Sequence, residues 1–159
     1  MQVRLVAVGK LKEKYWQDAV SEYLKRLRVY AKVEVVEVEE EKCPENLSAA
    51  LADRVREREG ERLLRAALPG SFVIALHLQG REYTSEEFAG FLRDLSLRGK
   101  SQLSFIIGGS LGLAPEVLAR ADLQLVFSRF TFPHQLIRVV LLEQVYRAFK
   151  IMHNEPYHK

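Results

Sequence analysis

The sequence has little of several features that would place it in a special class. It has one cysteine, Cys43, among 159 residues, so no disulfide can form within the chain and a reducing, cytoplasmic location is expected. No run approaches the roughly 18 apolar residues of a membrane span. The apolar stretch Leu5–Val8 ends before Lys10 and lacks a signal-peptide pattern. We therefore expect a protein with no membrane partner.

Metal and nucleotide-phosphate signatures are also missing. The four histidines include no pair at the i, i+4 spacing of helical metal ligands, so no metal site is predicted. The glycines of the chain do not follow the G-x-G-x-x-G or P-loop spacing, which leaves NAD and ATP without a signature. His77, at the end of an apolar run, is expected to be structural.

The length and composition indicate one globular domain covering residues 1–159. Apolar residues make up 48% of the chain, which suffices for one core. The 24 basic and 21 acidic residues give a net charge of +3, with basic residues in excess at both ends of the chain. This distribution permits a nucleic-acid partner without demanding one.

Apolar runs of strand length alternate with segments of helical periodicity, and no repeat or linker interrupts them. Thr84 and Glu87 form a capping box, and Gly99 suits the end of the helix that follows them. Such alternation predicts an α/β fold with a mostly parallel sheet and helices on both faces. Strands are predicted at 2–8, 33–38, 72–78, 103–107 and 123–127, and helices at 15–27, from Asn46 or Ser48 to about Leu68, between Thr84 and Gly99, from Pro115, and at 135–152.

The last predicted helix is apolar on two sides. The protein's own sheet could cover one stripe, which contains Ile137, Leu141, Leu142, Val145, Phe149 and Met152. A second face contains Leu136, Val139, Val140, Tyr146 and Ile151. This second face suggests a homodimer, although the domain could also wrap around the helix itself.

The loop Gly108–Gly112 matches G-x-S-x-G, the nucleophile elbow of serine hydrolases. Ser110 would be the nucleophile, Asp122 the acid, and His134, His153 or His158 the base. Pro115, however, places the next helix start several residues after Ser110, where the elbow would need it at the serine. A tight glycine loop that lets a ligand lie against the backbone is the stronger interpretation.

Two further segments are open to more than one interpretation. The aromatic loop from Phe127 to His134 either caps the core or forms an apolar cleft for a purine-like ligand. The tail His153–Lys159 is either a solvated end or a source of proton acceptors and a phosphate contact.

Long segments of the chain resemble the bacterial RlmH family of SPOUT-class methyltransferases. The opening Val-Arg-Leu-Val-Ala-Val-Gly fits the family, as does the length. The most specific segments are Phe105–Leu113, Phe127–Arg138, Glu143–Lys150 and Pro156–Lys159.

The resemblance implies an S-adenosylmethionine-dependent enzyme that methylates N3 of a pseudouridine in a hairpin loop of 23S rRNA, acting on assembled ribosomes. It also implies a C-terminal trefoil knot and an obligate homodimer. A dimeric ribosome-binding factor that keeps the fold without the chemistry is the non-enzymatic alternative.

Residue roles follow from the same resemblance. It assigns catalysis to His158 with Tyr157 assisting, and needs no metal. RNA contacts are expected from Arg138, Lys159 and Arg129, with Lys10 and Lys12 as further basic candidates. Cofactor binding is expected at Leu76, Gly108, Phe127, Ser128, Arg129, Phe130, Thr131 and Phe132.

Overall fold

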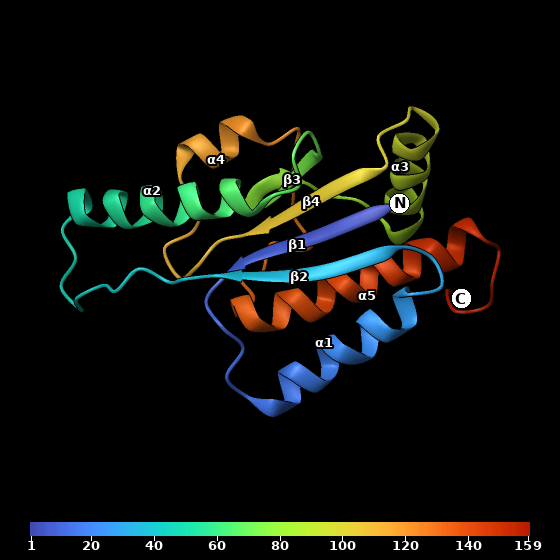
Figure 1. Cartoon of the computed structure of the whole chain (residues 1–159), viewed down its shortest axis with the longest axis horizontal. Coiled ribbons are helices and arrows are strands. Elements are labelled where there is room, and N and C mark those ends of the chain that lie inside the picture. Colours follow the sequence, from blue (N-terminus) through green and yellow to red (C-terminus); the bar gives the residue numbers. More distant parts are fainter.

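The computed structural model describes all 159 residues, which form a five-stranded parallel sheet and five helices (Figure 1). The strands lie in the order β2-β1-β4-β3-β5, and every pairing is parallel. The predicted α/β class is confirmed. The strands are β1 (Gln2–Val8), β2 (Lys32–Val38), β3 (Phe72–Arg81), β4 (Gln102–Ile107) and β5 (Leu123–Leu125), and the helices are α1 (Lys14–Leu27), α2 (Ala49–Ala66), α3 (Ser85–Leu97), α4 (Pro115–Arg120) and α5 (His134–Met152).

Helices cover both faces of the sheet, as the sequence predicts. Figure 1 shows α2 and α4 on one side and α1 and α5 on the other. The larger core joins the sheet to α1, α3 and α5 through residues such as Leu27, Leu92 and Leu142. A smaller core joins the opposite face to α2 and α4 through Leu63 and Val117. Central strands are therefore apolar on both faces, which explains their continuous apolar runs.

Local signals fix where the helices begin and end. The Thr84 hydroxyl accepts from the Glu87 amide, and the Glu87 carboxylate accepts from the Thr84 amide, which completes the predicted capping box. Gly99 has φ of 75°, the left-handed conformation predicted for it. The Ser48 hydroxyl accepts from the Leu51 amide and so serves as the N-cap of α2.

The third and last strands differ from the prediction. β3 continues to Arg81, and β5 stops at Leu125 rather than at Phe127. Leu125 pairs with both Leu76 and Arg81, so the regular pairing of β3 with β5 is interrupted between those two residues. A Cβ on Gly80 would lie 2.6 Å from the Leu125 carbonyl carbon, which explains the glycine. This close approach of the β3 backbone to the β5 backbone is consistent with the predicted knot.

Helix α5 is one residue longer than predicted and is buried on one side. Leu141, Leu142, Val145 and Phe149 of the predicted inner stripe are buried. Ile137 and Met152 of the same stripe are only half-buried. The predicted second face is half-buried along its length, and it contains Leu136, Val139, Val140, Tyr146 and Ile151. The chain alone therefore leaves apolar surface on this face of α5.

Candidate functional site

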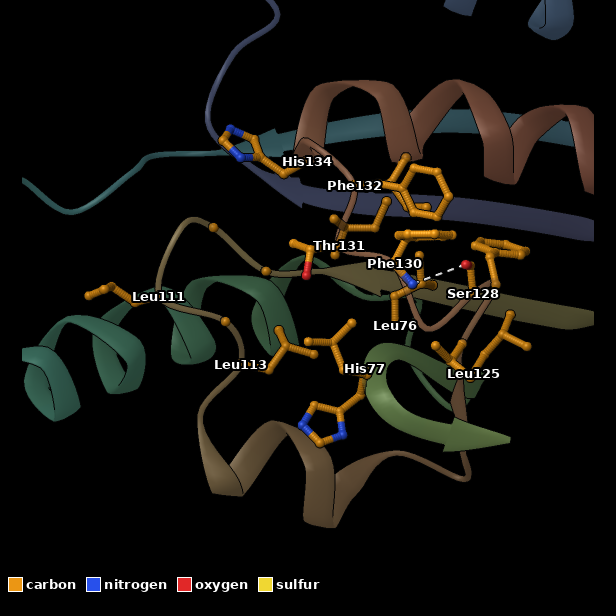
Figure 2. A pocket seen from close by; sticks show the side chains of 18 of the residues that line it. Leu76, His77, Leu111, Leu113, Leu125, Ser128, Phe130, Thr131, Phe132 and His134 are labelled. Atoms are coloured by element: carbon orange, nitrogen blue, oxygen red, sulfur yellow. Dashed lines mark hydrogen bonds between the residues drawn. The ribbon is translucent and has the colours of Figure 1, made fainter. Parts of the chain in front are cut away.

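A cavity opens at the carboxyl ends of β3, β4 and β5, where open α/β sheets bind their ligands. Its volume is about 390 Å³, within the range of small-molecule sites. Ile107 and Leu125 are the last residues of β4 and β5, and Leu76 lies within β3, where its regular pairing with β5 is interrupted. The loops after β4 and β5 supply most of the remaining wall (Figure 2).

The glycine loop after β4 folds back on itself to form one wall. The Gly112 amide donates to the Gly109 carbonyl over 3.0 Å, and Gly112 has φ of 80°. A Cβ on Gly108 would lie 2.9 Å from the carbonyl group of Gly112. A side chain on Gly108 would therefore clash with the loop, and one on Gly112 would strain its left-handed backbone, so the glycines bring bare backbone to the cavity.

Residues 127–132 of the aromatic loop form the opposite wall, and their backbone groups are available to a ligand. Five of the six residues have a backbone amide without a hydrogen-bond partner within the chain. The exception is Phe130, whose amide donates to the Ser128 hydroxyl over 3.1 Å (Figure 2). The carbonyls of the loop accept no hydrogen bond within the chain either. Donors and acceptors beside an apolar cavity are what recognition of a purine edge requires.

The structure brings together nearly all the residues predicted to bind the cofactor. Leu76, Gly108, Phe127, Ser128, Phe130, Thr131 and Phe132 all line the cavity. Arg129 does not line it, and its side chain is exposed. The site lies in one place because three parallel strands end at the same edge of the sheet.

Sequence analysis missed two polar residues of the cavity wall. His77 lies on β3 and Arg56 comes from α2, whereas His134, the last residue of the predicted aromatic loop, begins α5. The position of His77 directly after Leu76 was an available signal, whereas Arg56 is brought in only by packing of α2. Nδ1 of His77 is buried without a hydrogen-bond partner within the chain.

These features fit an adenosine-bearing cofactor such as S-adenosylmethionine. Leucine and phenylalanine side chains can enclose a purine ring, and the aromatic loop can bind its edge. The bare backbone at Gly108 leaves room for a ribose.

The predicted catalytic tail is held on the chain by polar contacts with α3 and α5. The Tyr157 hydroxyl donates to Oε1 of Glu143 over 3.0 Å. Burial raises the pKa of Tyr157 above its ordinary value, so the phenol keeps its proton. Arg147 also donates to Glu143, and its guanidinium lies 4.7 Å from the centroid of the Tyr157 ring.

Both ring nitrogens of His158 are engaged. Nε2 lies 2.8 Å from Oε1 of Glu86, and Nδ1 lies 3.2 Å from Nη1 of Arg147. Because Arg147 can only donate, Nδ1 is the acceptor and Nε2 carries the proton toward Glu86. Nδ1 must therefore lose its contact with Arg147 before His158 can take a proton from a substrate.

The structure does not bring the tail to the cavity of its own chain. None of the residues that line the cavity belongs to the tail. The cavity includes His134 and Ile137 at the start of α5, whereas the C-terminus lies toward the other end of that helix (Figure 1). A role for Tyr157 and His158 at such a cavity therefore requires a second copy of the chain.

The predicted contact between Arg138 and RNA phosphate is wrong for the folded chain. The Arg138 side chain is 0% exposed, donating to the Val8 carbonyl over 2.6 Å and to Glu37 over 3.3 Å. Burial lowers the pKa of Arg138 from its ordinary value, while Glu37 acts in the opposite direction. Arg129 and Lys159, by contrast, are exposed and accessible to phosphate.

The serine hydrolase alternative is also wrong. Helix α4 begins at Pro115, so Ser110 lies in the loop and not at a helix start. Oδ2 of Asp122 accepts from the Val73 amide over 2.7 Å, and its side-chain partner is Arg120. Without a histidine beside Asp122, the acid–base pair of a triad is missing.

The structure shows neither a metal-binding cluster nor a membrane-spanning helix. The structure contains no group of three or more histidine, cysteine, aspartate and glutamate residues arranged to hold a metal ion. None of its helices is both long enough and apolar enough to cross a bilayer. The thiol of Cys43 is exposed.

The fold and the cavity are those of an α/β protein with a cavity of ligand size at the carboxyl edge of its sheet. A family model described as "Predicted SPOUT methyltransferase" matches residues 1–158. The chain is 58% identical to the "Ribosomal RNA large subunit methyltransferase H" of Carboxydothermus hydrogenoformans and 53% identical to that of Clostridium acetobutylicum. Both matches span 159 residues and the whole of each protein. The chain belongs to the RlmH family of SPOUT methyltransferases.

Solved structures share the fold at much lower identity. TrmJ from Zymomonas mobilis gives a TM-score of 0.56 at 12% identity, over all of this chain and 73% of that one. This likeness supports the SPOUT fold and carries no information about the substrate.

Proposed function

We propose that the protein is an S-adenosylmethionine-dependent methyltransferase that methylates N3 of a pseudouridine in a hairpin loop of 23S rRNA, acting on assembled ribosomes in the cytoplasm. The observation that carries the proposal is the cavity whose aromatic loop leaves consecutive backbone donors and acceptors free beside apolar side chains. The names of the relatives supply the rRNA of the large subunit as the substrate class.

Binding would use the groups already described. The aromatic loop and the glycine loop would hold adenosine through backbone contacts, and Leu76 would pack against the base. When bound, S-adenosylmethionine supplies an electrophilic methyl carbon on a sulfonium. The protein contributes chiefly by placing that carbon in line with the acceptor nitrogen.

The acceptor nitrogen carries a proton that must leave as the new N–C bond forms and the S–C bond breaks. We assign acceptance of this proton to His158, with Tyr157 orienting the uracil-type ring. Because Nε2 of His158 carries its proton toward Glu86, only Nδ1 can accept another, so entry of RNA would have to displace Arg147 from Nδ1. The proton would then pass to Nδ1.

A homodimer would complete the site. The tail lies away from the cavity of its own chain, so Tyr157 and His158 would act at the cavity of the partner. The half-buried apolar face of α5 is the contact surface that we propose. Exposed Arg129 and Lys159 would contact phosphates of the rRNA.

Mass spectrometry of the matching 23S rRNA fragment tests the function. Cells without the gene should lack one methyl group on a pseudouridine, and purified protein with S-adenosylmethionine should restore it to ribosomes from those cells. A catalytically impaired variant, His158→Ala, is the matched control for the restoration. An unchanged fragment in cells without the gene would overturn the proposed substrate.

A further inference from the structure

The wall of the cavity contains one side chain with a permanent charge. Of its 19 residues, 11 are hydrophobic and three are the glycines of the loop. The other polar members are two hydroxyl residues and two histidines, Ser128, Thr131, His77 and His134. Arg56 is therefore the strongest partner that the cavity offers to an anionic group of a ligand.

Arg56 lies where the glycine loop borders the cavity. Its Nη1 is 3.4 Å from the Leu111 carbonyl, which places the guanidinium beside that residue. Figure 2 shows Leu111 well separated from Leu125 and from the aromatic side chains around Phe130. The cavity thus has an apolar, aromatic part and a separate cationic part.

The guanidinium keeps donors for a further partner. Its other contact is an ion pair with Asp53, one turn earlier on α2. Asp53 does not line the cavity and its side chain is 62% exposed, whereas that of Arg56 is 27% exposed. A guanidinium has five N–H donors, so these two contacts leave others for a carboxylate.

We propose that Arg56 binds the α-carboxylate at the amino-acid end of the cofactor and makes the site selective for ligands that carry this group. The inference rests on the proposed function and adds the residue that recognises the amino-acid end. Adenosine would occupy the apolar part, and the amino-acid end would extend past Leu111 toward α2. The uncharged adenosine would then lie in the apolar part of the cavity, and the anionic carboxylate would lie beside the cationic Arg56.

Two adenosyl ligands separate this interaction from binding of adenosine. S-adenosylhomocysteine carries the α-carboxylate, and 5′-methylthioadenosine has the same adenosine and thioether without it. Titration calorimetry should show that Arg56→Gln weakens S-adenosylhomocysteine about tenfold and changes 5′-methylthioadenosine by less than about twofold. Arg56→Lys, which keeps the charge and loses the fork, should fall between wild type and Arg56→Gln.

Arg54→Gln is the matched control, because Arg54 is exposed on the same helix and makes no side-chain hydrogen bond. It should leave both affinities unchanged. Since 5′-methylthioadenosine binding reports an intact adenosine site, its retention shows that Arg56→Gln is folded.

Four results would count against the proposal. Equal weakening of both ligands by Arg56→Gln, or unchanged affinity for S-adenosylhomocysteine, would overturn the carboxylate contact. Either result would leave the proposed function standing. Unchanged cofactor affinity with weaker binding of the rRNA hairpin would assign Arg56 to phosphate and also overturn it. If the wild-type protein binds neither ligand, the proposed function falls together with this inference.

Discussion

Nη2 of Arg138 donates a hydrogen bond of 2.6 Å to the backbone carbonyl of Val8, although the two residues lie 130 positions apart. The contact joins the first turns of α5 to the end of β1. Glu37 on β2 strengthens it, since its Oε2 accepts from both Arg138 and the Leu11 amide. One buried cation thus ties the last helix to the first two strands at the edge of the sheet that carries the cavity.

Arg138→Met should lower the free energy of unfolding by about 2–4 kcal/mol, because it leaves the Val8 carbonyl without its side-chain donor and Glu37 without its buried partner. Urea denaturation measures the loss. Arg129→Met removes an exposed arginine and should change stability by less than about 0.5 kcal/mol. Equal stability of the two variants would contradict a structural role for Arg138.

Gly80→Ala should destabilise the fold by more than about 2 kcal/mol, because the new Cβ would meet the Leu125 backbone at 2.6 Å and 2.7 Å. Gly90→Ala is the control, since no atom lies within 4 Å of the position that its methyl group would take on α3. Better helix propensity should make that variant more stable by about 0.5–1 kcal/mol. Thermal melts of both proteins test the prediction, and a Gly80→Ala protein as stable as wild type would refute the close approach of Gly80 to the backbone of β5.

Deletion of Tyr157–Lys159 should leave a folded dimer that binds S-adenosylhomocysteine with unchanged affinity. Methyl transfer should fall by about 100-fold or more, the usual contribution of a positioned acid or base. Calorimetry and transfer of a labelled methyl group to ribosomes measure the two effects. Loss of folding would show that the contacts of Tyr157 with Glu143 and of His158 with Glu86 serve stability instead.

Val140→Glu should weaken the proposed homodimer, because it places a carboxylate on the half-buried apolar face of α5. Leu97→Glu alters an apolar side chain that is 79% exposed on α3 and should leave association unchanged. Sedimentation at low protein concentration distinguishes the two variants. A Val140→Glu protein that stays dimeric would remove α5 from the interface.

Glu59→Gln should raise the melting temperature at pH 7. Burial raises the pKa of Glu59, and Glu40 acts in the same direction, while the Glu41 amide and Arg62 oppose them. The folded chain therefore binds this proton more tightly than the unfolded chain, so Glu59 makes stability fall as pH rises above its ordinary pKa. Gln keeps an acceptor for the Glu41 amide, which Oε1 of Glu59 accepts over 3.0 Å.

The difference between wild type and Glu59→Gln should vanish below about pH 4, where the carboxyl is protonated in both states. Melts across this pH range provide the measurement. A variant less stable than wild type at pH 7 would show that ionised Glu59 contributes favourable contacts.

Local sequence patterns were enough to predict the order and kind of the helices and strands and most residues of one site. Apolar periodicity separates strands from helices, and the capping box at Thr84 marks a helix start that the structure reproduces. Leu76, Gly108 and most of the aromatic loop could be placed together because parallel strands present their carboxyl ends at one edge. These features depend on local chemistry and on sheet topology.

Contacts between side chains far apart in the sequence could not be predicted from local patterns, because they form only when the helices and strands pack together. In the sequence, Arg138 is a basic residue that could contact RNA. In the structure its side chain is buried against Val8 of β1 and Glu37 of β2. Arg56 joins the cavity only because α2 packs beside the glycine loop, and His158 lies away from the cavity because α5 carries the tail past it. Burial and long-range pairing depend on the packing of several elements at once, which no local pattern encodes.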